Sequence, residues 1–439
     1  MTFRSLHDPT HIYFITATVC SWQPLFAEPT YARIVLDSLA WLRRRQRTAA
    51  RRTAATLGNG DSAALRDASP SPRCSIISPG CPPIGGPAQS REVPMSLMHD
   101  EIYEQPSIIE DLLKLEADRV RGIAAELRPR DLRFVVIAAR GSSDNAARYG
   151  QYAFGSLLGL QVALATPSLF TLYNQPPRLR DALVIGVSQS GQSEDIVAVL
   201  AEGRRQGVPT LAITNSPDSP LAAQADYLIE THAGLERSVA ATKTYTSELA
   251  ALGLLVAAWM DKPGHFSDLE TLPQIMRRAL ELEPALQAAA AKYQQAQHCI
   301  VLGRGYNYGT AFEIALKLKE TCYLAAEPYS PADFLHGPVA LIEAGFLAIM
   351  VAPSGAAFAN LRRFAAGLKD RGASLLMISD QEEALRMADL PLLLPALPAE
   401  WVSPPVAIIP GQLLALHLSQ ARGIDPDRPR GLKKVTVTR

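Results

Sequence analysis

Residues 183–193 read Leu-Val-Ile-Gly-Val-Ser-Gln-Ser-Gly-Gln-Ser, an apolar run that ends in a turn rich in hydroxyl groups. Such a run is typical of a strand buried on both faces of a parallel sheet. A helix that begins after the turn presents unsatisfied backbone amides, which together with clustered hydroxyls favour a phosphate group over a mere N-cap. Because the turn has no lysine, it indicates a monophosphate instead of a nucleotide triphosphate. The side chains expected to hold this phosphate are Ser188, Gln189, Ser190 and Ser193.

Further apolar runs at Phe134–Ala138 and Leu211–Ile213 alternate with helical patterns rich in Ala and Leu. This alternation predicts an α/β fold in which helices cover both faces of a parallel sheet. Ser142 and Ser143 follow the first of these runs. Ligands of open α/β sheets bind at the carboxyl ends of the strands, so we expect both hydroxyl groups near the phosphate turn.

The pattern is repeated at a nearly constant distance along the chain. Arg140-Gly141 returns as Arg304-Gly305, and Ser190-Gly191 returns as Ser354-Gly355, in both cases 164 residues later. This offset predicts a duplicated α/β domain. The second turn, residues 352–355, reads Ala-Pro-Ser-Gly and has lost most of the hydroxyl groups, so we expect one phosphate site per chain.

The second copy carries candidate groups for proton transfer. Glu313, Lys317 and Glu320 are spaced four and three residues apart, so they share one face of an expected helix. Their neighbours are apolar, which favours a carboxylate facing a pocket over a solvated ion pair. A glutamate beside a lysine can move protons between adjacent carbon atoms. His336 lies in an expected turn where imidazole can act as an acid or base, although a lone histidine is more often structural.

The composition excludes several classes of protein. Lys+Arg and Asp+Glu are 43 each in 439 residues, so the net charge does not indicate a nucleic-acid partner. The five cysteines form no Cys-x-x-Cys pair, which argues against a zinc site and a disulfide framework. No secretion signal is visible, and the apolar run Leu249–Met260 is shorter than the ~20 residues of a membrane span, so it indicates a buried helix. We expect a cytoplasmic protein without a membrane partner.

The first 94 residues differ in texture from the rest. Residues 1–47 read as a short α+β fragment and resemble the opening of the REP-associated transposases, without the paired histidines and tyrosine that such a nuclease needs. Residues 48–94 are rich in proline and poor in periodic apolar residues, which predicts a disordered linker. We therefore expect the functional protein to begin at Met95 or Met98.

Residues 95–439 resemble the tandem sugar-isomerase (SIS) domain family, and in particular the isomerase half of glutamine–fructose-6-phosphate aminotransferase and the related glucosamine-6-phosphate deaminases. The resemblance implies two flavodoxin-like, doubly wound domains, at 95–265 and 266–439. Six motifs carry it in order along the chain: Glu101-Ile-Tyr-Glu-Gln-Pro106, Ser188-Gln-Ser-Gly191, Ser238-Val-Ala-Ala-Thr-Lys243, Lys317-Leu-Lys-Glu320, His336-Gly-Pro338 and Lys434-Val-Thr436.

The resemblance also implies roles for the matching positions. Glu320 would shuttle a proton between C1 and C2 of the sugar with help from Lys317, and Lys434 would bind the open-chain carbonyl. His336 would open the sugar ring from the partner subunit of a homodimer. No metal or organic cofactor is implied. The residues implied to bind the substrate are Ser142, Ser143, Ser188, Gln189, Ser190, Ser193, Val239 and Ala241.

Two departures from the aminotransferase guide the expected reaction. No cysteine follows an N-terminal Met, as the glutaminase nucleophile of that family does, and Ala241 replaces a serine often found there. We expect conversion of glucosamine 6-phosphate to fructose 6-phosphate and ammonia. The alternatives are formation of glucosamine 6-phosphate by an aminotransferase-type half, a deaminase or deglycase for another phosphosugar, and a non-catalytic phosphosugar sensor.

Overall fold

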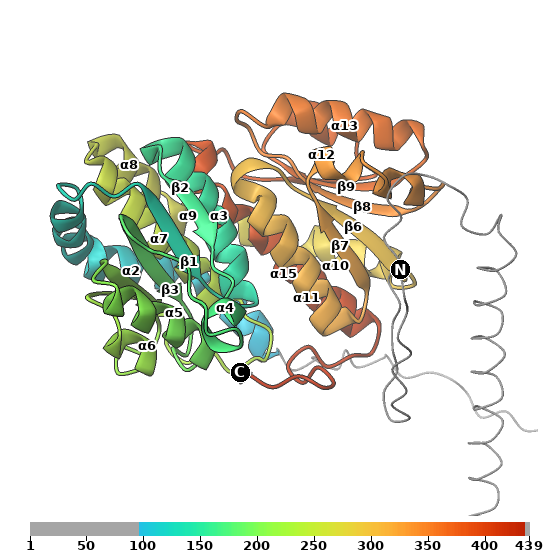
Figure 1. The fold of residues 1–439 in the computed structure, drawn as a ribbon. Helices are drawn as coiled ribbons and strands as arrows, with labels where there is room; N and C mark the ends of the chain where they lie inside the picture. Colours follow the sequence, from blue (N-terminus) through green and yellow to red (C-terminus); the bar gives the residue numbers. More distant parts are fainter. Residues whose placement is uncertain (1–95, 435–439) are drawn as a thin grey trace, which may run out of the picture. The chain divides into compact units, whose positions relative to one another are not determined.

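The computed structural model describes residues 96–434, whose strands form two parallel sheets of five strands each (Figure 1). The expected transposase-like fragment at 1–47 and the linker at 48–94 lie outside the described residues. The first sheet has the order β2-β1-β3-β4-β5 and the second the order β10-β9-β8-β6-β7. The first contains β1 (Phe134–Ala138), β2 (Gln161–Leu164), β3 (Ala182–Val187), β4 (Thr210–Thr214) and β5 (Tyr227–Glu230). The second contains β6 (His298–Leu302), β7 (Ala325–Tyr329), β8 (Leu347–Val351), β9 (Ser374–Ser379) and β10 (Leu390–Leu393).

The two sheets confirm the predicted α/β fold and its duplication. Strand β1 begins at Phe134 and its counterpart β6 at His298, which is the offset of 164 residues expected from the sequence. Read by counterpart, the strand orders of the two sheets are the same. The central strands β3, β4 and β8 are buried along their whole length, as expected of strands covered on both faces.

Helices connect the strands and cover the sheets. Those of the first half are α2 (Leu97–Leu127), α3 (Ser142–Leu158), α4 (Ser168–Thr171), α5 (Glu194–Arg205), α6 (Pro220–Ala223) and α7 (Lys243–Met260). Those of the second half are α8 (Pro263–Glu270), α9 (Leu272–Leu280), α10 (Glu283–Tyr293), α11 (Tyr308–Cys322), α12 (Pro331–Phe334), α13 (Phe358–Asp370), α14 (Glu382–Leu385) and α15 (Pro404–Ala421). Three short 3₁₀ turns complete the described chain: Gly305–Asn307, Pro338–Leu341 and Glu400–Val402.

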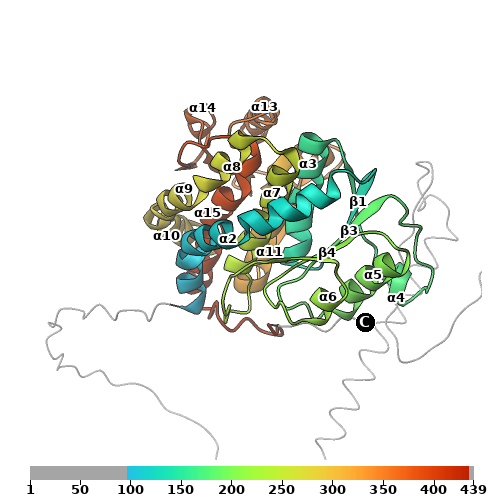
Figure 2. The same ribbon diagram turned by 90° about the vertical axis from the view of Figure 1, so that its left-hand side faces the viewer.

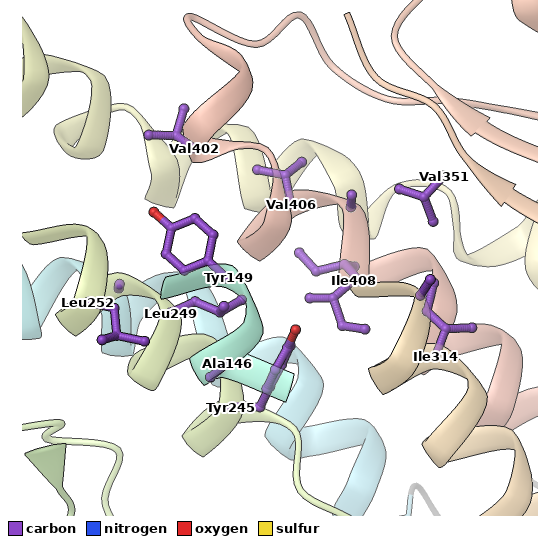
Figure 3. Close-up of a cluster of buried hydrophobic side chains, with 14 of the residues drawn as sticks. Ala146, Tyr149, Tyr245, Leu249, Leu252, Ile314, Val351, Val402, Val406 and Ile408 are labelled. Atoms are coloured by element: carbon purple, nitrogen blue, oxygen red, sulfur yellow. The ribbon is translucent and has the colours of Figure 1, made fainter. Parts of the chain in front are cut away.

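The two halves share one hydrophobic core. Helix α15 packs on α9, α10 and α11 and also reaches α2 and α7, and α2 runs across α7 and α9 (Figure 2). Figure 3 shows the side chains that meet there, with Tyr149 from α3, Leu249 from α7, Ile314 from α11 and Val406 from α15. Helices α3, α11 and α15 therefore lie between the two sheets, and neither sheet has a core of its own on that side (Figure 1).

Two long apolar helices are core helices. The predicted buried helix at Leu249–Met260 is the main part of α7, which is buried from Lys243 to Ala258. The segment Glu400–Ala421 is long and apolar enough to cross a membrane, but 94% of its most apolar window is buried inside the protein. Its apolar character is therefore explained by its place between the two halves.

Candidate active site

A cavity of about 410 Å³ lies at the carboxyl ends of β1 and β3, where ligands of open α/β sheets bind. Both halves of the chain line it. The first half contributes Arg140, Gly141, Ser142, Ser143, Ser188, Gln189, Ser190, Ser193, Glu236, Val239, Ala241, Thr244 and Glu248, and the second half contributes Glu320, Leu432, Lys433 and Lys434. Every residue predicted to bind substrate lines this cavity, as do Glu320 and Lys434.

The turn between β3 and α5 forms one end of the cavity. Gly191 has a φ of +62°, and a Cβ atom there would meet the Ser219 hydroxyl at 2.1 Å, so only glycine fits this bend. The bend lets the Gly191 amide donate to Ser188 Oγ at 3.2 Å and the Gln192 amide donate to Ser190 Oγ at 3.3 Å. Ser193 is the N-cap of α5 and makes no capping hydrogen bond with its side chain. This turn has the hydroxyl groups and helix N-terminus of an anion site.

Ser142 and Ser143 begin α3, directly after β1 and the turn at Gly141. Ser142 Oγ donates to Glu313 Oε1 at 2.8 Å, and Ser143 Oγ donates to Glu248 Oε1 at 2.7 Å. Neighbouring residues of a helix point in different directions, so the two serines connect the cavity to two different buried carboxyl groups.

Helix α11 brings its charged residues together as the sequence predicted. Lys317 Nζ lies 3.2 Å from Glu313 Oε1 and 2.7 Å from Glu320 Oε2. The Lys317 side chain is fully buried, whereas that of Glu320 is 22% exposed. Burial by itself would lower the pKa of Lys317, but Glu313 and Glu320 raise it above its ordinary value, so Lys317 remains an ammonium group. Glu320 alone of the three lines the cavity, with Lys317 directly behind it.

The last described residues lie over the cavity. Lys434 Nζ donates to Glu236 Oε2 at 2.5 Å, which ties this segment to the loop before α7. Glu236 is buried and also accepts hydrogen bonds from the Thr242 amide at 2.8 Å and the Thr244 hydroxyl at 2.8 Å. Burial alone would raise the pKa of Glu236, but Lys434 and these hydrogen bonds lower it below its usual range. An ionised Glu236 therefore holds Lys434 at the cavity.

Of the four predicted catalytic residues, Glu320 and Lys434 line the cavity and Lys317 lies directly behind Glu320, whereas His336 lies elsewhere. It is exposed in the turn after α12, where its amide donates to the Asp333 carbonyl at 3.1 Å, and it does not line the cavity. Its predicted contribution to a site on a partner subunit needs such an exposed position, and it stays a prediction.

The cavity residues that were not predicted as site residues include two carboxyl groups, Glu236 and Glu248. Glu236 begins a loop of small and hydroxyl-bearing residues, and its charge before that loop was the available signal. Glu248 is followed by twelve uncharged residues of an apolar helix. Because burying a carboxyl group costs free energy, this pattern indicates that Glu248 has a specific partner or role.

Comparison with known proteins identifies the family. A model of the SIS domain matches this chain twice, at residues 130–258 and 292–421. The chain belongs to the SIS domain family. Each match contains one of the two sheets, so the duplication is a tandem pair of SIS domains.

The similar curated proteins are longer than the segment that this chain matches. The chain is 36% identical to a glutamine–fructose-6-phosphate aminotransferase of Thermococcus kodakarensis over 351 residues, which is 77% of this chain and 58% of that protein. It is 37% identical to the enzyme of the same name from Methanothermobacter thermautotrophicus, with 77% and 57% covered. The chain thus spans less than two thirds of the length of these relatives. The solved C-terminal domain of glucosamine-fructose-6-phosphate aminotransferase from Francisella tularensis aligns with a TM-score of 0.70 at 27% identity, covering 78% of this chain and all of that one.

Proposed function

We propose that this chain is an enzyme that converts glucosamine 6-phosphate and water to fructose 6-phosphate and ammonia. The observation that carries the proposal is the single cavity in which the hydroxyl turn of the first SIS domain faces Glu320 of the second. A phosphate bound at Ser188–Ser193 would fix the sugar so that its reacting end extends toward Glu320 and Lys434. The names of the similar aminotransferases support a substrate of this class.

The proposed reaction begins with the open-chain amino aldehyde. The Glu320 carboxylate takes the proton from C2, the Lys434 ammonium gives a proton to the C1 oxygen, and the enolamine forms. Lys317 Nζ, 2.7 Å from Glu320 Oε2, holds that carboxyl group at the cavity, and Lys434 donates to the carbonyl oxygen. Glu320 then returns its proton to C1, and the resulting iminium nitrogen gives one proton back to Lys434, which leaves a C2 imine. Water adds to that imine, and ammonia leaves to give fructose 6-phosphate.

Water is the co-reactant in this proposal, and the two cysteines of the described residues offer no thiol for hydrolysing glutamine in this cavity. Hydrolysis of glutamine on an enzyme commonly uses a cysteine nucleophile, but neither cysteine in the described part of the chain lines the cavity. Cys299 and Cys322 are both buried, and burial raises the pKa of the Cys322 thiol to about 11, so neither is an activated thiolate.

The test measures ammonia and fructose 6-phosphate released from glucosamine 6-phosphate, with no glutamine added. Equal amounts of both products are expected. Binding of glucosamine 6-phosphate without either product would contradict the proposal and favour another phosphosugar or a sensor.

We also propose that two subunits share each site through His336. Glu320→Gln and His336→Ala variants should each be inactive alone, because each lacks one group of every site. Mixed and reassembled, they should regain about a quarter of the wild-type activity if each dimer forms at random, since half of the dimers then hold one intact site of two. An inactive mixture that contains mixed dimers would contradict the shared site.

A further inference from the structure

Glu248 of α7 is a carboxyl group in the cavity wall that the proton shuttle does not use. Its side chain is 1% exposed, and it lines the cavity. Oε1 accepts the Ser143 hydroxyl at 2.7 Å, whereas the buried Oε2 has no hydrogen-bond partner within residues 96–434. A buried polar oxygen left without a partner costs free energy, so a donor or acceptor from a ligand is the natural complement of this atom.

The hydrogen bonds of Ser142 and Ser143 indicate which substrate atoms Glu248 can contact. Ser142 reaches the Glu313–Lys317–Glu320 group, and Ser143 reaches Glu248, so the first turn of α3 separates the two carboxyl sites. If Glu320 moves a proton between C1 and C2, these carbons lie beside Glu320 and the serines. Glu248 lines the same cavity as Glu320, so the proposal below assigns it to the substituent on C2.

The surroundings of Glu248 keep its proton in place. Burial raises its pKa, and the nearby carboxyl groups of Glu236 and Glu313 raise it further, while the Ser143 hydroxyl and the Lys434 ammonium oppose them. The resulting pKa is about 8. The buried phenol of Tyr245 on the same helix interacts electrostatically with Glu248, and its own pKa lies well above its usual range, so it stays neutral. At neutral pH the cavity thus holds one uncharged carboxylic acid beside the ionised Glu236.

We propose that Glu248 is the acid that protonates the C2 nitrogen as ammonia leaves, an inference that rests on the proposed function. After water has added to the imine, C2 carries a hydroxyl and an amino group. Glu248 gives its proton to the nitrogen, and the C2–N bond breaks with its electron pair going to the departing ammonia. The hydroxyl oxygen forms the C2 carbonyl, and its proton passes to the Glu248 carboxylate. The acid is thereby restored, with no oxidant or cofactor.

The test separates proton transfer at C2 from loss of ammonia. Glucosamine 6-phosphate is incubated with the enzyme in deuterated water, and deuterium at C2 of the recovered substrate is measured beside ammonia release. In Glu248→Gln the amide keeps the size and can keep the Ser143 hydrogen bond but cannot supply the acid. Ammonia release is expected to fall about 10²- to 10⁴-fold, while deuterium exchange stays within about twofold of wild type.

The matched control is Glu116→Gln. Glu116 is a carboxyl group on α2 of similar burial, 3% exposed, which accepts from His232 and does not line the cavity. This variant should keep both exchange and ammonia release near the wild-type rates. Ammonia release within twofold of wild type in Glu248→Gln would overturn the inference alone. A loss of exchange equal to the loss of ammonia would also overturn it, since Glu248 would then serve the shuttle or the fold.

A second measurement needs no variant. Because the acid form of Glu248 is required, the ratio of ammonia release to deuterium exchange in the wild-type enzyme should fall as pH rises through about 8. The ratio cancels changes in substrate binding, since both reactions start from the same complex. A ratio that stays constant from pH 6 to pH 10 would overturn the inference. Wild-type enzyme that shows neither exchange nor ammonia would instead contradict the proposed function.

Discussion

The turn after β3 and its counterpart after β8 have the same place in their domains but opposite environments. In the first domain, the turn at Ser188–Ser193 opens on the cavity. In the second domain, the protein's own carboxylates occupy the equivalent turn. Asp380 accepts from both the amide and the hydroxyl of Ser354 at 2.6 Å, and Glu400 accepts from the Ala356 amide at 2.7 Å.

This difference shows how a duplicated domain can divide its tasks. The bend after the strand gathers backbone amides and hydroxyl groups in both copies, an arrangement that favours an anion. In the second domain, the carboxylates of Asp380 and Glu400 accept these hydrogen bonds, so the turn there makes a structural contact. Its contribution to the cavity comes instead from α11 and from the segment at Lys434.

The largest effect expected from this division is the loss of turnover in Glu320→Gln. The second domain would then lose the base, while the first keeps its phosphate turn. We expect kcat to fall about 10²- to 10⁴-fold, with the Kd for glucosamine 6-phosphate little changed. Rate assays and titration calorimetry measure the two quantities, and unchanged turnover would remove Glu320 from the proton transfer.

A matched pair of glycine substitutions tests the two turns directly. Gly191→Ala places a Cβ atom against Ser219 and should shift the phosphate turn, raising KM on the order of 100-fold. In Gly355→Ala, at φ +142°, the Cβ atom would meet the Glu400 carboxyl group at 2.2 Å. That variant should lose about 1–3 kcal/mol of unfolding free energy and keep its KM. Equal changes of KM in both variants would contradict the division of tasks.

A second matched pair removes one hydroxyl from each turn. Ser190→Ala should raise KM about tenfold with kcat little changed, because a hydrogen bond to a charged phosphate contributes about 1.5 kcal/mol or more in the ground state. Ser354→Ala should leave KM unchanged and lower the unfolding free energy by about 1 kcal/mol, because Asp380 loses one donor. A fall confined to kcat in Ser190→Ala would speak against a phosphate contact.

The smallest expected effect concerns the ion pair between Lys434 and Glu236. The pKa of Glu236 is lowered in the folded protein, so the pair stabilises the fold above the ordinary value of 4.5 and ceases to do so as pH falls through the lowered value. Lys434→Met should therefore cost about 1 kcal/mol at pH 7, and this cost should vanish in strong acid. Denaturant titrations across pH measure it, with Lys433→Met as the control. A cost independent of pH would contradict the pairing.

The inner strands of the two sheets could be predicted from the sequence, and the edge strands could not. The runs at β1, β3 and β4 are continuously apolar because helices cover both faces of these strands, and the repeat at 164 residues predicted their counterparts in the second sheet. The four edge strands β2, β5, β7 and β10 were not predicted. Strand β2 alternates between exposed and half-buried residues, and β7 contains a glutamate and a proline, so neither has the apolar run of a central strand.

The site was predictable where local sequence makes it. The turn at Ser188–Ser193, which we propose binds phosphate, is built from consecutive residues, so its hydroxyl groups were visible in one stretch. Helix spacing grouped Glu320 with Glu313 and Lys317, and the resemblance to the SIS family then singled out Glu320 and added Lys434. Glu248 was not predicted as a site residue. Its place in the site depends on a hydrogen bond from Ser143, 105 residues earlier, and on a cavity that only the folded chain forms. Spacing along one helix could not show which carboxyl group faces that cavity.

The core shared by α7 and α15 determines what happens when the chain is cleaved between its two halves. Each half has a complete sheet, and the exposed joint at Asp261-Lys262 invites a single cut between α7 and α8. Both fragments would then bare long apolar helix faces that only the other fragment can cover. A nicked molecule is therefore expected to persist as a tight complex of two pieces, and the pieces to regain their fold when refolded together and to aggregate when refolded apart.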